Sequence, residues 1–137
     1  MKKTLIILFL LLFAFSCKEE EADCFYCDSH NSGVLVIDNY LDVPVTAAIT
    51  WNLRCENHDI KDSMNFYIDA YSFISLEVPD CIGIVDIIND TYEIKGKTIT
   101  ISKCYTHRIS VYTDGDNKGF ISDPSLVYNP NSIVYAP

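Results

Sequence analysis

Short apolar runs alternate with polar connections along most of the chain. The runs begin after Gly33, and β-branched residues are frequent in them. They are VLVID (34–38), PVTAAITWNL (44–53), MNFYIDAYSFISLEV (64–78), IGIVDII (82–88), KTITIS (97–102) and HRISVYT (107–113). Residues that favour turns, mainly Asn, Asp, Gly and Pro, lie between and within these runs. Runs of this length and composition are typical of β-strands.

Strict alternation is clearest in the last two runs. Ile99 and Ile101 share one face of KTITIS, and polar residues occupy the other face. Ile109 and Val111 share one face of HRISVYT in the same way. A helix over 56–63 would be short, because that stretch is polar and lacks an apolar period of ~3.6 residues. We therefore predict an all-β fold, a small antiparallel β-sandwich of the immunoglobulin-like type.

The C-terminal end repeats itself. SLVYNP (125–130) recurs as SIVYAP (132–137). The offset is odd, so the two copies would bury opposite faces of one continuous strand unless Asn129-Pro130-Asn131 turns the chain. Chance is one explanation of the repeat. A pair of edge strands is the other, with Pro130 and Pro137 ending the ladder.

The N-terminus has the parts of a secretory signal peptide. Lys2 and Lys3 precede an uninterrupted apolar run from Leu5 to Phe15, and Ser16 follows it. The run is too short to span a bilayer, which takes about 20 apolar residues. A basic start, an apolar centre and a small residue before the cut are the features that a signal peptidase recognises. We expect cleavage directly before Cys17.

With a cysteine at that position, FAFSC resembles the lipobox of bacterial lipoproteins. The resemblance implies that the Cys17 sulfur carries a diacylglyceryl group and that the new amino terminus is acylated, for example by palmitate. Phe15 is bulkier than the residue usual at its position, and an unlipidated secreted form is the alternative. Two or three acyl chains would anchor the protein stably in a membrane.

The next residues are KEEE, Lys18, Glu19, Glu20 and Glu21. They resemble the export signal of surface lipoproteins of the Bacteroidota type, which implies an outer-membrane lipoprotein at the cell surface. The alternative is a solvated tether on a periplasm-facing protein. The sequence thus predicts a signal peptide over 1–16, a lipidated cysteine and acidic tether over 17–32, and a single domain over 33–137.

The composition is strongly acidic. The 137 residues include 19 Asp and Glu against 10 Lys and Arg. Cleavage before Cys17 removes Lys2 and Lys3 and no acid, which takes the formal charge from −9 to −11. Such a surface repels nucleic acid and anionic headgroups. We expect no nucleic-acid partner, contact with the membrane only through the lipid, and an unidentified protein or glycan as ligand.

Five of the six cysteines remain if Cys17 carries lipid. An odd number permits at most two disulfides, which persist in an exported protein. The candidates are Cys24, Cys27, Cys55, Cys81 and Cys104. The last three each border a strand-like run, and we favour bridges among them.

CFYCDSH (24–30) has the spacing of metal ligands. Cys24, Cys27 and His30 follow a C-x2-C-x2-H pattern that suits zinc, and Cys55 or His58 would have to supply a fourth ligand. Structural zinc sites normally present two such pairs, and only one is present here. We favour a structural role for these cysteines, in disulfides or as thiols.

DGDNKGFISD (114–123) partly matches a calcium loop. Asp114, Asp116 and Gly119 fall at positions 1, 3 and 6 of that motif. Lys118 replaces a ligand, however, and Ser125 stands where the bidentate glutamate belongs. A glycine-containing loop after a strand is the favoured interpretation.

The aromatic residues form two groups. Those within strand-like runs are expected mainly in the core, with a ligand-stacking face as the alternative; they are Trp51, Tyr67, Tyr71, Phe73, Tyr105 and Tyr112. Those in or near turns are expected at the surface; they are Tyr40, Tyr92, Tyr128 and Tyr135.

The sequence contains no nucleophile with its base, no paired-carboxylate signature and no phosphate loop. His58 and His107 are expected at solvent-exposed strand ends. We predict a membrane-anchored, non-catalytic lipoprotein without a cofactor, which binds protein or glycan at the cell envelope through a loop end or a sheet face. The alternatives are a structural accessory subunit of an envelope complex and a metal-binding module built on Cys24, Cys27 and His30.

Overall fold

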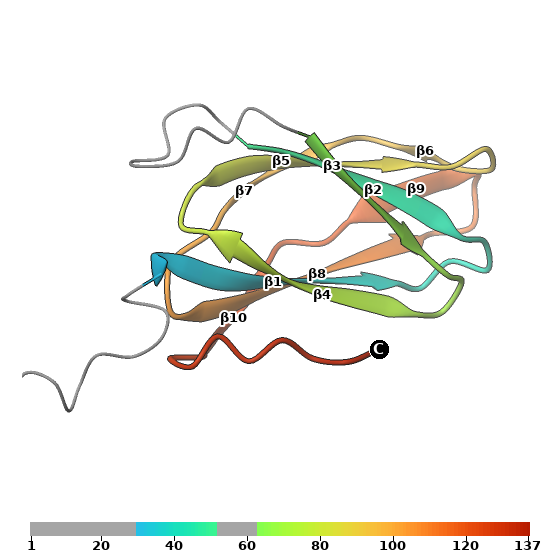
Figure 1. The fold of residues 1–137 in the computed structure, drawn as a ribbon. Coiled ribbons are helices and arrows are strands. Elements are labelled where there is room, and N and C mark those ends of the chain that lie inside the picture. The colour runs from blue at the N-terminus through green and yellow to red at the C-terminus, as the bar shows by residue number, and fades with distance from the viewer. Residues whose placement is uncertain (1–29, 52–62) are drawn as a thin grey trace, which may run out of the picture.

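The computed structural model describes residues 30–51 and 63–137, without the side chain of Trp51. These residues form ten strands. They are β1 (Ser32–Asn39), β2 (Val45–Trp51), β3 (Ser63–Ile68), β4 (Phe73–Pro79), β5 (Ile82–Ile88), β6 (Glu93–Ile94), β7 (Lys97–Thr100), β8 (Tyr105–Thr113), β9 (Lys118–Ile121) and β10 (Ser125–Tyr128). The strands build two sheets that pack face to face (Figure 1). The prediction of an all-β sandwich is confirmed.

The two sheets differ in size. Sheet A has six strands in the order β4-β1-β8-β9-β6, with β10 also paired to β8, and sheet B has four in the order β3-β2-β5-β7. Most neighbours are antiparallel, but β1 and β8 run parallel, as do β6 and β9. The first strand of an immunoglobulin sheet lies at its edge. Because β1 lies inside sheet A, the immunoglobulin-like subtype stays a prediction.

The core lies between the inner faces of the sheets. Ile99, Ile101, Ile109 and Val111 are all buried there, as their alternation predicted. Burial alternates along β5, where Val85 faces the core. Each buried aliphatic side chain of this size contributes about 1.5–3 kcal/mol to stability.

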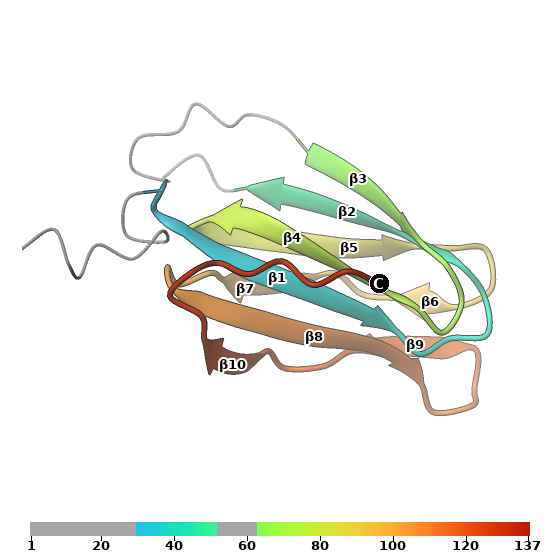
Figure 2. The same cartoon turned by 60° about the horizontal axis from the view of Figure 1, so that its bottom comes forward.

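β1 is buried along its whole length. Leu35 and Ile37 belong to the core, and Val34 and Val36 point to the outer face of sheet A. The chain after β10 covers that face and crosses β1 in Figure 2. It is held there by contacts of Ser132 with Ser32 and of Tyr135 with Ser75 on β4.

This arrangement settles how the C-terminal repeat is used. The first copy supplies β10, which pairs with β8 at the edge of sheet A. The chain then turns at residues 129–131, and the second copy forms no strand. The proposed pairing of the two copies is therefore wrong.

A bulge divides the hairpin that β8 forms with β9 and β10. Val111 pairs with Ile121, and Arg108 pairs with Ser125, so three steps along β8 correspond to four along the opposite strand. The extra residue lies at 122–124, where Pro124 has no N–H to donate to the ladder. β9 and β10 are thus two halves of one interrupted strand.

Candidate functional site

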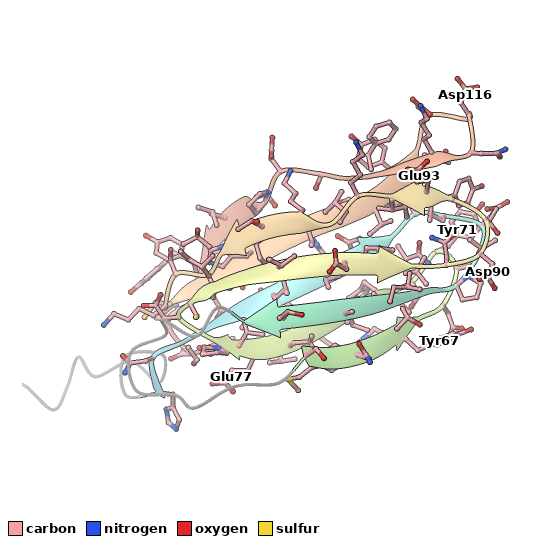
Figure 3. All side chains as sticks on the ribbon, turned by 90° about the horizontal axis from the view of Figure 1, so that it is seen from above. Tyr67, Tyr71, Glu77, Asp90, Glu93 and Asp116 are labelled. Atoms are coloured by element: carbon pink, nitrogen blue, oxygen red, sulfur yellow. The ribbon has the colours of Figure 1, made fainter. Side chains whose placement is uncertain are left out.

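Four connections gather at one end of the sandwich. They are the segments 40–44, 69–72, 89–92 and 114–117, which join β1 to β2, β3 to β4, β5 to β6 and β8 to β9. We call them the loop end. Figure 3 shows Tyr71, Asp90 and Asp116 there, with Tyr67 and Glu93 beside them.

Backbone hydrogen bonds join the connections to one another and to the sheets. The Tyr71 N–H donates to the Leu41 carbonyl (3.2 Å), and the Glu93 N–H donates to the Asn117 carbonyl (3.1 Å). The Tyr92 hydroxyl donates to Asp42 Oδ1 at 3.0 Å. These contacts fix the relative positions of all four connections.

A buried amide supports two of them. Asn39 Nδ2 donates to the carbonyls of Val43 (2.9 Å) and Asp69 (3.0 Å), and its Oδ1 accepts from the Leu41 N–H (3.1 Å). A buried amide needs such partners, because an unpaired polar group costs about 1–3 kcal/mol. Asn39 therefore ties the first connection to the second.

Tyrosines cover the surface of this end. Tyr71 is 73% exposed, and Tyr40 and Tyr67 are nearly as exposed. Tyr71 has a positive φ of 54° and lies in the tight turn between β3 and β4. Tyr92 is half-buried against the core. Tyr40 and Tyr71 of the loop end, and Tyr67 beside it on β3, thus present three largely exposed phenol rings.

Its charge is entirely negative. The connections carry five exposed carboxylates and no Lys or Arg. They belong to Asp42, Asp69, Asp90, Asp114 and Asp116. The hydrogen bond to Asp42, followed by burial, raises the pKa of the Tyr92 hydroxyl. Rigid tyrosines beside short polar side chains are typical of protein surfaces that recognise other molecules.

The core prediction for the strand aromatics is wrong for four of them. Tyr67 and Tyr112 occupy outward positions of their strands, Tyr105 is exposed as the first residue of β8, and Tyr71 lies in a turn. Phe73 is half-buried. Tyr40, Tyr128 and Tyr135 are exposed, as predicted. Alternation alone could have placed Tyr112 outward, because it follows the inward-facing Val111.

The candidate calcium residues Asp114 and Asp116 lie in the exposed turn between β8 and β9. The Asp116 N–H donates to Asp114 Oδ1 at 3.4 Å, a contact within the turn. Gly119 is buried in β9, and a Cβ there would lie 2.5 Å from Ile94 Cγ1, so this glycine serves strand packing. Within residues 30–51 and 63–137, no three potential ligands are grouped to hold a metal ion.

Most of the cysteine predictions fall outside the described residues. Cys17, Cys24, Cys27 and Cys55 lie outside them, as does the KEEE cluster. Of the proposed zinc ligands, the structure therefore describes only His30, which is exposed. Cys81 and Cys104 are buried and disulfide-bonded. Both lie near the start of β1: the Cys104 N–H donates to the Ser32 carbonyl, and the N–H of Asp80, which precedes Cys81, donates to the Asn31 carbonyl.

His107 is buried, contrary to the expectation of an exposed strand end. It is only 1% exposed because it is in phase with Ile109 and Val111 on the inner face of β8. Its Nε2 accepts from the Ser102 N–H at 2.8 Å. Burial lowers the pKa of His107, while the Ser102 backbone and Asp80 act in the opposite direction.

Arg108 contacts two neighbouring strands across the outer face of sheet A. Its Nε lies 2.9 Å from Asp38 Oδ2 on β1, and its guanidinium lies 5.9 Å from the ring centre of Phe73 on β4. Asp38 is buried, so this ion pair compensates a carboxylate that has little access to water.

No family model matches the chain, and no curated protein matches it. Within the described part of the chain, no helix has the length and apolar character needed to cross a membrane.

Proposed function

We propose that this chain is a membrane-anchored, non-catalytic lipoprotein that binds a protein or glycan at the cell envelope through the loop end. One observation carries the proposal: the loop end lies at the opposite end of the sandwich from Ser32, where the N-terminal segment joins the domain. The eight residues of β1 alone separate the two ends by roughly 25 Å, at about 3.3 Å per residue.

An anchor at Cys17 would therefore hold the domain by its far end. The loop end would point away from the membrane, and the acidic tether would add reach. Its carboxylates would also be repelled by anionic headgroups. These features suit display towards a partner in solution or on another surface.

The chemistry of the loop end agrees with recognition. Tyrosine buries a large area at a low cost in side-chain entropy, and carboxylates accept hydrogen bonds from sugar hydroxyls or basic side chains. The surface is preorganised, because its loop conformations are held by the backbone and by Asn39.

The second candidate function is that of a structural accessory subunit, and the composition of the outer face of sheet B supports it. Ile82, Ile84 and Ile88 are exposed on it, and Asp86 is its only charged residue among the described strands. A flat, nearly uncharged face of this kind suits a permanent partner. The metal-binding alternative rests on Cys24 and Cys27, outside the described residues, and stays a prediction.

The anchor is tested by Cys17→Ser. The substitution removes the lipid attachment point, so we expect the protein to move from the membrane fraction to the soluble fraction. Protease treatment of intact cells then distinguishes the two orientations, with a periplasmic protein as the control. Retention of the variant in the membrane would contradict the lipoprotein assignment.

Binding is tested with Tyr40→Ala and Tyr71→Ala against the matched control Tyr135→Ala. The full-length protein would be screened on glycan arrays and against purified envelope proteins. We expect the loop-end variants to reduce binding of any ligand about tenfold or more, as truncating a central tyrosine does. If only Ile84→Asp on sheet B reduces binding, the result would favour the accessory subunit instead.

A further inference from the structure

The basic residues of the described chain are concentrated in one place. Only five Lys and Arg occur in residues 30–51 and 63–137, and three of them, Lys95, Lys97 and Lys118, line one hollow of about 550 Å³. Glu93 is the single acid that lines it. In a chain of formal charge −9, this hollow is locally positive.

Strand packing preforms the hollow. β6 runs parallel to β9, with Ile94 opposite Gly119, and the chain then crosses from sheet A to β7 in sheet B. Gly119 lets Ile94 approach closely, and the Asp86 side chain occupies the place that a Cβ would take at Gly96. These contacts set the positions of both walls without a ligand.

The three lysines have different roles. Lys97 Nζ donates to Asp123 Oδ1 (2.5 Å) and to the Ile121 carbonyl (3.3 Å), so it joins β7 to the end of β9. Lys95 and Lys118 are exposed, and their ammonium groups form no ion pair within the described residues. Two cationic groups therefore remain available to a ligand.

An aromatic wall borders these lysines. Phe120 lines the hollow, is 39% exposed, and lies beside Tyr112 with ring centres 5.7 Å apart and planes inclined by 31°. Exposed aromatic planes offer an apolar surface to the C–H face of a sugar ring. The volume also falls within the range of small-ligand sites, roughly 300–1,000 Å³.

We propose that this hollow binds an acidic saccharide, with Lys95 and Lys118 holding its carboxylate and Phe120 contacting the sugar ring. Extended polyanions and anionic membranes are disfavoured, because they would meet the negative surface around the hollow. A small ligand avoids that repulsion, since charges beyond about 8 Å are screened at physiological salt. The hollow adjoins the loop end at Glu93 and Lys118, but none of the loop-end residues lines it, and its ligand does not depend on the proposed function.

The test is calorimetric titration of the full-length protein in detergent with three probes. They are a disaccharide ending in glucuronic acid, the matched neutral disaccharide ending in glucose, and inorganic phosphate. We expect the acidic disaccharide to bind, with affinity that falls as salt is raised, and the other two to bind at least about tenfold more weakly.

Variants assign the contacts. Lys95→Gln combined with Lys118→Gln should weaken binding of the acidic disaccharide about tenfold, as expected for two exposed charge pairs. Phe120→Leu should reduce the preference for the disaccharide over phosphate. Lys103→Gln, an exposed lysine outside the hollow, should change nothing. Thermal melts would establish that each variant is folded.

Several results would overturn the proposal. Equal binding of the acidic and neutral disaccharides would remove the role of the lysines, and equal binding of phosphate would reduce the hollow to an unspecific anion site. Unchanged affinity in the folded double-lysine variant would place the ligand elsewhere. Absence of binding at millimolar concentrations of the acidic disaccharide would refute the site altogether.

Discussion

β1 and β5 are both rich in apolar residues, but they differ in how far their outer faces are buried. Both strands pack one face against the core. The C-terminal segment covers the outer face of β1, whereas the outer face of β5 is exposed to solvent. Val36 is 1% exposed and Ile84 is 45% exposed. The apolar character of a strand therefore does not determine whether its outer face is buried; a segment remote in the sequence does.

The largest expected effect on stability comes from placing the same charge on each of the two outer faces. Val36→Asp would place an unpaired carboxylate beneath the C-terminal segment and should lower the free energy of unfolding by about 3–5 kcal/mol. Ile84→Asp introduces the same charge on the open face and should change it by about 0.5 kcal/mol or less. Denaturant unfolding measures both. Similar losses would mean that the two outer faces are equally covered.

The second prediction concerns the anchor of the covering segment. Asn129 Nδ2 donates to Thr106 Oγ1 (2.9 Å) and to the Ile133 carbonyl (3.1 Å), and its Oδ1 accepts from the Ile133 N–H (3.0 Å). Asn129→Ala should cost about 1–3 kcal/mol, because it leaves buried partners unpaired. Limited proteolysis should then cut the C-terminal segment faster.

Asn131→Ala is the control for that variant, since Asn131 is exposed two positions along the same turn. It should leave both stability and proteolysis unchanged. Equal effects of the two substitutions would show that turn propensity, rather than the hydrogen bonds of Asn129, holds the segment.

The third prediction concerns the core that both strands share. The pKa of His107 is lowered from its usual 6.5, so between the lowered pKa and 6.5 the unfolded chain binds more protons than the folded protein. Stability should therefore fall as pH decreases below 6.5, by up to about 1.4 kcal/mol per pH unit. His107→Gln should abolish this dependence in unfolding measured from pH 7.5 to 5.

Asp123 provides an internal check on the pH series. Its hydrogen bond with Lys97 lowers the pKa of this carboxyl from 3.8, so its contribution is present above that value and is lost at more acidic pH. Asp123 therefore cannot account for a loss of stability that begins near pH 6.5. If the free energy of unfolding of His107→Gln still falls to the same extent between pH 7.5 and 5, another group is responsible for the pH dependence.

The smallest effect tests the ion pair on the covered side. Arg108→Met removes the partner of Asp38 and should cost about 1 kcal/mol, because the arginine is half-exposed and water can take the place of its guanidinium beside Asp38, which the covered position of Val36 does not allow. Lys95→Met, at an exposed position without an ion pair among the described residues, should cost less. Thermal unfolding at low and high salt measures the difference, which should shrink as salt screens the charges.

Local patterns predicted the strands well and their environments poorly. The alternation of Ile99, Ile101, Ile109 and Val111 located the inner faces of β7 and β8 and the chain just after β7, because sheet periodicity is a local property. The same pattern extended backwards reaches His107, whose burial was missed because its charged neighbour Arg108 suggested a solvent-exposed strand end.

The remaining features depend on distant contacts. The cover over β1 rests on contacts such as that between Ser32 and Ser132, which are 100 positions apart. β9 was read as part of a loop, since its pairing with β8 and β6 gives no local signal. Likewise, nothing near Lys95 in the sequence indicates that Lys118 lines the same hollow.

The way in which the loop end is held has an evolutionary consequence. Its conformation depends on main-chain hydrogen bonds and on the buried Asn39, and scarcely on the rings of Tyr40 and Tyr71. Mutations can therefore exchange the exposed side chains while the backbone that presents them is inherited unchanged. Lineages that carry this fold could diverge in what they recognise without losing the ability to fold.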